Sequence, residues 1–153
     1  MNIFVPYPDS MKCAEALDDL RLNKMILETA QILSTVLHHY KTSMNVYKAT
    51  HVNHPCCVWA RQNKSNYRWL YGHFVDLCDE KFYRTGKTHK SATLALMFAD
   101  GIKLLPEGQQ TPFANCTPYK LISDVHAAYR ATLIGKWIAD KRPPKWTKRQ
   151  KPF

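Results

Sequence analysis

The sequence predicts a mainly α-helical fold: a compact single-domain helical bundle with a short extended N-terminal arm and a basic C-terminal tail. The 153 residues suffice for one domain with a hydrophobic core, but not for two. One long run, residues 10–40, contains neither glycine nor proline, and its apolar residues recur at helical spacing. Residues that start or end helices border several such segments, and no internal repeat is visible.

The first part of the chain predicts an extended segment followed by one long helix. Residues 2–5 alternate loosely in polarity and end at Pro6, which favours a short extended arm. Ser10 is a good N-cap residue, so a helix is expected from there to about Tyr40. A loop over residues 41–54 is expected to follow.

Two further helices are expected in the middle of the chain. Pro55 suits the first turn of a helix over residues 56–83, and Gly86 suits the position just beyond its end. Ser91 is a candidate cap for a shorter helix over residues 92–99.

The rest of the chain predicts an irregular segment, a last helix and a tail. Residues 101–118 are rich in proline, glycine and polar residues, and Ser123 opens a helix that reaches about Lys141. We therefore divide the chain into a helical domain of residues 1–140 and a basic tail of residues 141–153.

The tail is strongly basic. It contains six cationic residues and no acidic one: Lys141, Arg142, Lys145, Lys148, Arg149 and Lys151. One interpretation is a solvated, frayed terminus, because blocks of like charge are often unstructured. The other is an arm in which Lys145, Lys148 and Arg149 bind nucleic-acid phosphate. Trp146 would then be available to stack on a base.

The composition indicates a polyanionic partner. Lysine and arginine outnumber aspartate and glutamate by 22 to 12, which gives a net charge of +10 and a pI near 9.5. Nucleic acid is the first candidate and an anionic membrane surface the second. No segment approaches the roughly 18 apolar residues of a membrane span, and the start of the chain lacks the pattern of a signal peptide.

The cysteines indicate a reducing compartment. They are odd in number and follow no regular framework: Cys13, Cys56, Cys57, Cys78 and Cys116. Together with the missing signal pattern, this predicts reduced thiols and a cytoplasmic protein. No cofactor is expected.

The first long helix carries a polar seam opposite its core stripe, which includes Leu22, Ile26 and Leu33. The residues of the seam are Arg21, Lys24, Glu28, Gln31 and Thr35. Apolar residues border it on both edges: Leu20 and Leu27 on one, Met25 and Ile32 on the other. A polar seam between apolar borders predicts partial burial, where charges must be paired.

Two interpretations of this seam are open. It is either a structural ion-pair network, in which Lys24 and Glu28 are i,i+4 partners, or the face of an active site. In the second case Glu28 is the acid/base, and Arg21 and Lys24 bind phosphate. We favour the second interpretation.

A second candidate site surrounds the helix start at Pro55. Backbone N–H groups at a helix start can bind an anion, and nearby polar side chains can assist them. The candidate side chains here are those of His51, Asn53, His54 and Arg61. Alternatively, Asn53 caps the helix while the histidines pack. The residues with metal-ligating atoms are His51, His54, Cys56 and Cys57. Their spacing matches no standard zinc finger, so no metal site is predicted.

A third candidate site is the basic segment of residues 83–91. Its cationic or titratable residues are Arg84, Lys87, His89 and Lys90. The Gly86-Lys87-Thr88 sequence looks like the end of a phosphate-binding P-loop, but Lys81 occupies the position of the first glycine and no strand precedes it. We expect phosphate contact; the alternative is a basic loop that satisfies the carbonyls at the preceding helix end.

Several segments together show a family resemblance that covers roughly the first 60 residues. They are Met1–Asp9, Leu17-Asp18-Asp19 with Arg21-Leu22 and Lys24, Gln31-Ile32-Leu33, and His51–Pro55 with Trp59. This set resembles small phage and bacterial proteins grouped with pyrimidine-dimer DNA glycosylases of the endonuclease V type. The second half looks like a phage-type variant.

The resemblance implies a compact helical DNA-repair enzyme that is both hydrolase and lyase. In that family the N-terminal α-amine attacks the sugar C1′, the resulting imine permits strand cleavage, and a glutamate of the first helix assists. It implies catalytic roles here for Met1 or Asn2 and for Glu28, with Asp19 behind it.

Two departures from the family pattern leave alternatives open. The known enzymes have threonine at the position of Asn2, and their glutamate directly follows an arginine, whereas Arg21 is followed by Leu22. Either the site has been rebuilt around Glu28, or the fold was kept and the lyase chemistry lost.

The leading prediction is a DNA glycosylase/AP lyase that acts on a damaged or modified base, with double-stranded DNA as partner. One alternative is a noncatalytic phage DNA-binding or host-takeover protein in the host cytoplasm. Another is a nucleotide-processing enzyme that uses the clusters at 51–54 and 87–90.

Overall fold

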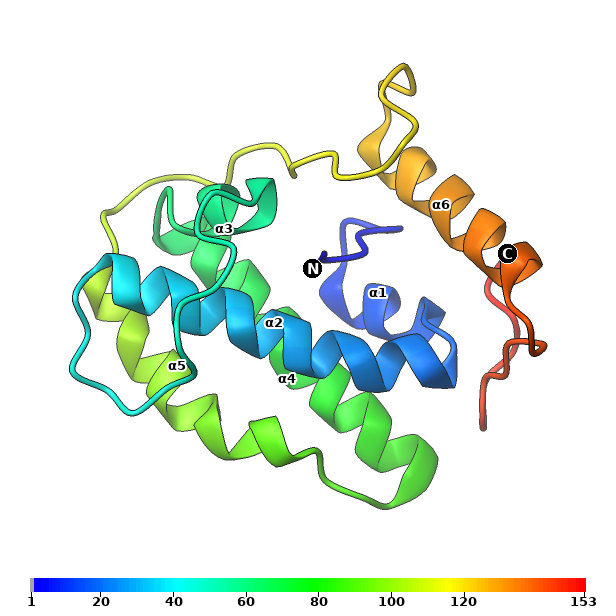
Figure 1. Cartoon of the computed structure of the whole chain (residues 1–153), viewed down its shortest axis with the longest axis horizontal. Coiled ribbons are helices and arrows are strands. Elements are labelled where there is room, and N and C mark those ends of the chain that lie inside the picture. The colour runs from blue at the N-terminus through cyan, green and yellow to red at the C-terminus, as the bar shows by residue number, and fades with distance from the viewer. Residues whose placement is uncertain (1) are drawn as a thin grey trace.

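A computed structural model describes residues 2–153. Its elements are α1 (Ser10–Ala16), α2 (Asp19–His39), α3 (Pro55–Ala60), α4 (Lys64–Thr85), the 3-10 turn η1 (Lys90–Leu94), α5 (Ala95–Gly101), the 3-10 turn η2 (Ile102–Leu104) and α6 (Val125–Ala139) (Figure 1). No strand occurs within residues 2–153. The predicted mainly α fold is therefore confirmed.

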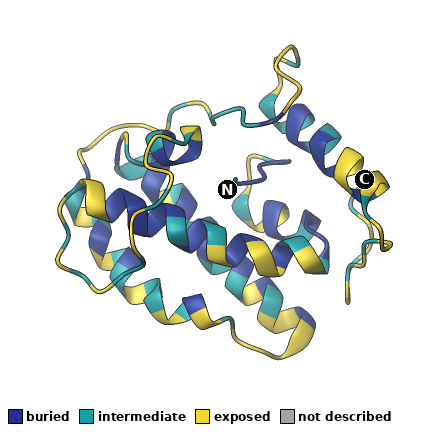
Figure 2. Ribbon diagram, in the orientation of Figure 1, coloured by how far each residue is buried: buried dark blue, intermediate teal, exposed yellow. Residues whose placement is uncertain are grey.

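Helices α2 and α4 form the centre of the fold. They pack against each other, α1 packs on α4, and α3 packs against both (Figure 1). The facing side chains of the two long helices are apolar and fully buried, among them Ile26, Leu33, Tyr67 and Phe74. Figure 2 shows buried residues along α2 and the N-terminal segment, and exposed ones on the loops. No helix of residues 2–153 is long and apolar enough to cross a membrane.

The N-terminal arm runs through the interior of the protein. Ile3, Phe4 and Val5 are buried, and their segment lies between α2 and α6 (Figure 1). His126 of α6 lies with Nδ1 2.8 Å from the carbonyl oxygen of Val5, and Arg130 donates to the carbonyl of Pro6. The arm is extended, as expected, but it is part of the core.

The prediction of a single helix over residues 10–40 is wrong, because the helical conformation is interrupted at Leu17 and Asp18. Asp18 has extended backbone angles, and its Oδ1 accepts a hydrogen bond from Arg21 N at the start of α2. An aspartate that caps a new helix ends the preceding one. Asp9, not Ser10, caps α1 by accepting from Lys12 N.

The expected helix over residues 56–83 is split in the same way. Its start at Pro55 is confirmed, but α3 ends at Ala60, and Asn63 caps α4 by accepting from the backbone N–H of Asn66. Gly86 ends α4 in the left-handed conformation with φ of 67°, as predicted.

The predicted N-cap residues of the two later helices are also wrong. His89, not Ser91, caps the segment before α5, which begins as the 3-10 turn η1. Asp124, not Ser123, caps α6 by accepting from His126 N. In both cases the side chain of the residue just before the helix accepts from the N–H group of the second helical residue, which has no partner within the helix.

The C-terminal tail lies against the helical domain. Trp146 packs edge-on against Trp137, with 4.9 Å between the ring centres, and its indole donates to the carbonyl of Ala16. Phe153 contacts the rings of both Trp137 and Tyr7. The frayed terminus considered above is therefore wrong, and Trp146 is packed against the protein.

Candidate active site

The central feature of the site is a contact between the arm and α2. The backbone nitrogen of Asn2 donates a hydrogen bond of 2.9 Å to Oε2 of Glu28. The side chain of Glu28 is 13% exposed, and Nζ of Lys24 lies 3.6 Å from its other oxygen, Oε1. A half-buried carboxylate thus lies between the start of the chain and a solvent-exposed lysine.

A pocket of about 320 Å³ surrounds this contact. Its lining comes from the arm, α2 and α6: Asn2, Phe4, Leu20, Arg21, Lys24, Met25, Glu28 and Lys136. The volume is at the lower end for small-molecule sites. Lys136 and Phe4 could not be identified from the sequence, because the packing of α6 against the arm has no local sequence signal.

The predicted partial burial of the seam is confirmed on one edge only. Met25 and Ile32 are buried in the hydrophobic core, whereas Leu20 and Leu27 are exposed. The side chains of Glu28 and Arg21 remain 13% and 12% exposed. The seam is therefore open on the side of Leu20.

Arg21 is tied to two carboxylates. It donates two hydrogen bonds, of 2.7 and 2.8 Å, to Asp140 at the end of α6, and one of 2.9 Å to Asp18. The hydrogen bonds to Asp140, with a smaller effect of the one to Asp18, raise the pKa of the Arg21 guanidinium above its usual range, although burial opposes this. Arg21 lines the pocket, but its charge is used to join α2 to α6.

Asp19 and Arg84 belong to a different cluster. The side chain of Arg84 is 1% exposed and donates to Glu80, Asp19 and the carbonyls of Leu17 and Glu15. Instead of the expected phosphate contact, Arg84 makes a buried structural network. Burial opposes the ionisation of Asp19, but hydrogen bonds from Thr147 and Arg84 lower its pKa.

Two of the tail cations complete this network. Arg149 donates to both carboxylate oxygens of Glu80, and its guanidinium lies 4.6 Å from the ring centre of Tyr83. Lys148 donates to the carbonyl of Tyr83. These contacts fix the tail on α4.

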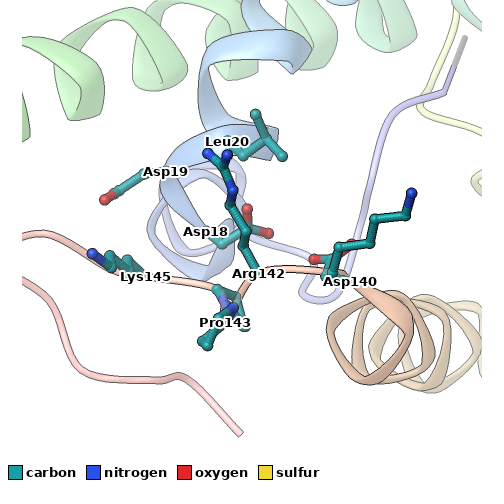
Figure 3. A pocket seen from close by; sticks show the side chains of 9 residues that line it. Asp18, Asp19, Leu20, Asp140, Arg142, Pro143 and Lys145 are labelled. Atoms are coloured by element: carbon teal, nitrogen blue, oxygen red, sulfur yellow. The ribbon is translucent and has the colours of Figure 1, made fainter.

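Three exposed tail cations, Lys141, Arg142 and Lys145, instead line a second pocket, of about 540 Å³. Its lining residues are Asp18, Asp19, Leu20, Asp140, Lys141, Arg142, Pro143, Pro144 and Lys145. Figure 3 shows Arg142 extending from the tail toward Leu20. Because Leu20 lines both pockets, these cations lie next to the pocket of Asn2 and Glu28.

Of the four residues predicted to form a site around Pro55, two are exposed and two hydrogen-bond to the protein backbone. His51 and Asn53 are exposed, and His51 has a positive φ of 49°. His54, not Asn53, caps α3, since its Nδ1 accepts from Cys56 N at 3.2 Å. Arg61 donates to the carbonyl of Val52.

The remaining residues of the basic segment lie at the turn between α4 and η1. Lys87 and Lys90 are exposed, and His89 is half-buried as the cap of η1. Burial lowers the pKa of His89. This turn contributes no residue to either pocket described above.

One cluster was not predicted from the sequence. His54 and Cys56 meet Cys116, which comes from the irregular segment before α6. The Cys56 thiol hydrogen-bonds to Cys116 and, despite burial, this lowers the pKa of Cys116 to about 7. The spacing of residues 51–57 contains no signal for a partner this far along the chain.

Comparison with known proteins decides the family. Residues 1–94 match the family model of the pyrimidine dimer DNA glycosylases. The chain belongs to the pyrimidine dimer DNA glycosylase family. No curated protein and no solved structure is significantly similar to it.

The family match covers most, but not all, of the site of this glycosylase-family protein. It includes the arm and helices α1 to α4, and thus Asn2, Lys24 and Glu28. It extends beyond the first 60 residues to include the basic segment around Lys87. Helix α6 and the tail, which contribute Lys136 and Lys145, lie outside it.

Proposed function

We propose that this protein is a DNA glycosylase with AP lyase activity, in which the α-amine of Asn2 is the nucleophile and Glu28 is the acid/base. The observation that carries the proposal is the 2.9 Å hydrogen bond from the Asn2 nitrogen to Glu28. Removal of Met1, which lies outside the described residues, would convert this nitrogen into a primary amine. An ordinary α-amine has a pKa of about 8, so a substantial fraction of such amines is neutral, and therefore nucleophilic, at neutral pH.

The reaction follows from these two groups. The amine lone pair forms a bond to the sugar C1′, and the bond from C1′ to the base breaks as the base takes up a proton. Glu28 accepts the proton released by the amine and stabilises positive charge on the sugar. The ring oxygen takes up the proton held by Glu28 as the sugar ring opens to an imine. The Glu28 carboxylate then accepts a C2′ proton, and the electron pair of that C–H bond forms a double bond as the 3′ phosphate leaves.

The pocket and the cations around Asn2 and Glu28 suit a DNA substrate, as expected for the family. An enzyme that attacks C1′ must take its target out of the base stack, and the pocket beside Glu28 opens to solvent for such a group. Exposed cations near the pocket include Lys24, Lys136, Arg142 and Lys145. We assign them to phosphates of double-stranded DNA, with His51, Asn53, Lys87 and Lys90 as outer contacts. Asp19 has no role in this proposal.

Borohydride trapping on a duplex with one abasic site tests the mechanism. We expect a covalent adduct, located by peptide mass spectrometry on the N-terminal residue. Glu28→Gln should bind the duplex and give little adduct, whereas Glu107→Gln, at an exposed carboxylate paired with Lys64, should behave as the unaltered protein. Binding without any adduct would contradict the lyase and favour a noncatalytic DNA-binding protein.

A further inference from the structure

Three side chains with metal-ligating atoms converge behind the N-terminal arm. His54 and Cys56 come from the start of α3, and Cys116 comes from the segment between η2 and α6. One ligand atom of each residue lies within 4.8 Å of the other two. His54 and Cys56 alone would be near each other simply because they are two positions apart at one helix end. Cys116 joins them from a distant part of the chain, which local spacing does not explain.

The distance between the two sulfur atoms suits a shared tetrahedral metal. The Sγ atoms of Cys56 and Cys116 are 3.5 Å apart. Zinc–sulfur bonds of about 2.3 Å at tetrahedral angles place two sulfur ligands about 3.8 Å apart. A disulfide requires about 2.05 Å, so the observed distance is much closer to that of a metal-bridged pair.

An oxygen atom of the arm lies close to one of these sulfur atoms. Oδ1 of Asn2 is 3.7 Å from Sγ of Cys56. With zinc–oxygen bonds of about 2.1 Å, a sulfur and an oxygen ligand of one tetrahedron are about 3.6 Å apart. The same Oδ1 lies 3.4 Å from the hydroxyl oxygen of Tyr129.

The surroundings support the two cysteines as ligands. Cys56 is fully buried, while His54 and Cys116 are half-buried, so an ion could enter from one side. The backbone N–H of Cys116 donates to the hydroxyl of Tyr129, which in turn donates to the carbonyl of Ala114. Two thiolates and one divalent cation sum to zero charge, which limits the electrostatic cost of burial.

We infer that His54, Cys56 and Cys116 bind a zinc ion, with the amide oxygen of Asn2 as the fourth ligand. This function is separate from the proposed glycosylase chemistry. The ion would join three parts of the chain: the arm, the start of α3 and the segment before α6. It would thereby hold residue 2, whose nitrogen faces Glu28, in place.

Metal content and cobalt spectroscopy of the tag-free full-length protein test the inference. Protein purified under reducing conditions should contain stoichiometric zinc by elemental mass spectrometry. Replacement of zinc by Co²⁺ should give thiolate-to-cobalt charge-transfer absorption and the intense d–d bands of a tetrahedral centre. These measurements need no variant, so they decide the matter even where a substitution unfolds the chain.

Variants locate the ion. Cys116→Ser and His54→Ala should each weaken zinc binding by more than about tenfold. Asn2→Ala should keep the charge-transfer absorption and change the d–d bands. Cys78→Ser removes a half-exposed thiol outside the cluster and should leave metal content and spectrum unchanged.

Two results would overturn the zinc site. One is equal zinc binding by Cys116→Ser and the unaltered protein. The other is a Cys56–Cys116 disulfide that, once reduced, takes up neither zinc nor cobalt. Loss of the trapped DNA adduct with zinc binding intact would count against the glycosylase mechanism alone, so the two proposals fail separately.

Discussion

The backbone nitrogen of Asn2 and the carboxylate of Glu28 are joined by a hydrogen bond of 2.9 Å, although 26 positions separate them in the sequence. The contact depends on burial of the arm, in which Ile3 and Val5 are almost fully inaccessible. Helix α6 holds the arm from its other side through His126 and Arg130. The start of the chain is thus placed by core packing.

Glu28→Gln should lower glycosylase and lyase turnover by about 100-fold or more, because the amide neither accepts a proton nor stabilises a cationic sugar as a carboxylate does. DNA affinity should change little. Single-turnover cleavage of a lesion-containing duplex, with binding measured in parallel, checks this. An unchanged cleavage rate would remove Glu28 from the mechanism.

Asn2→Ser should increase the fraction of protein that forms the borohydride-trapped adduct. Initiator methionine is removed more readily before a small residue than before asparagine, and the primary amine is then at the position that faces Glu28. Intact-mass analysis measures the removal of Met1, and gel analysis measures the adduct. Because Asn2→Ser also removes the amide oxygen proposed to bind zinc, preparations of this variant with equal zinc content are compared. If the adduct fails to rise with the processed fraction among them, the nucleophile is not the amine of residue 2.

The helices were largely predictable from the sequence, but their breaks were not. Apolar periodicity and the absence of proline identified the helical segments correctly. Asp18 and Asn63 interrupt two of them, because each side chain accepts a hydrogen bond from the backbone of a new helix. A polar residue within an apolar periodic pattern is compatible with either an exposed face or a cap, and only packing decides.

The part of the candidate site that lies within a single helix was predictable from the sequence. The half-buried seam with Lys24 and Glu28 lies within α2, so its polarity pattern was visible locally. Arg84 was assigned to phosphate because a cation in a basic segment has no local sign of burial. The proximity of Cys116 to His54 and Cys56 was not predictable, because these two residues lie in a distant part of the chain.

Arg84→Met should destabilise the protein by about 3–5 kcal/mol, because it leaves the buried carboxylate of Glu80 and the nearby Asp19 with fewer partners. Urea denaturation checks the value. Lys103→Ala breaks an exposed ion pair with Asp100 and should cost under about 1 kcal/mol. Equal effects of the two substitutions would show that the Arg84 network is not structural.

The stability of the protein should fall as the pH drops from about 6.5 to about 4, because of His73. Burial lowers the pKa of this histidine to about 4, although the carbonyl of Ser10 lies 3.2 Å from its Nδ1. An unfolded chain binds the proton near pH 6.5, whereas the folded protein resists it until about pH 4, so protons favour unfolding in this window. His73→Gln should flatten the dependence of the urea midpoint on pH there, and an unchanged slope would exclude His73 as its origin.

The double variant Arg142→Ala/Lys145→Ala should weaken DNA binding and lower the salt dependence of the affinity. Both cations line the pocket that adjoins Leu20, and neither belongs to the Glu80 network that fixes the tail. Removal of one cation that binds a phosphate should reduce the slope of log affinity against log salt by about 0.9, so a decrease of about 2 is expected for the pair.

A matched control separates local contact from overall charge. Lys41→Ala/Lys48→Ala removes the same charge from the exposed loop between α2 and α3, outside both pockets. If the two double variants reduce the slope equally, the tail contributes only general charge. If only the tail variant reduces it, the DNA backbone passes beside the pocket of Asn2 and Glu28, as an attack on C1′ requires.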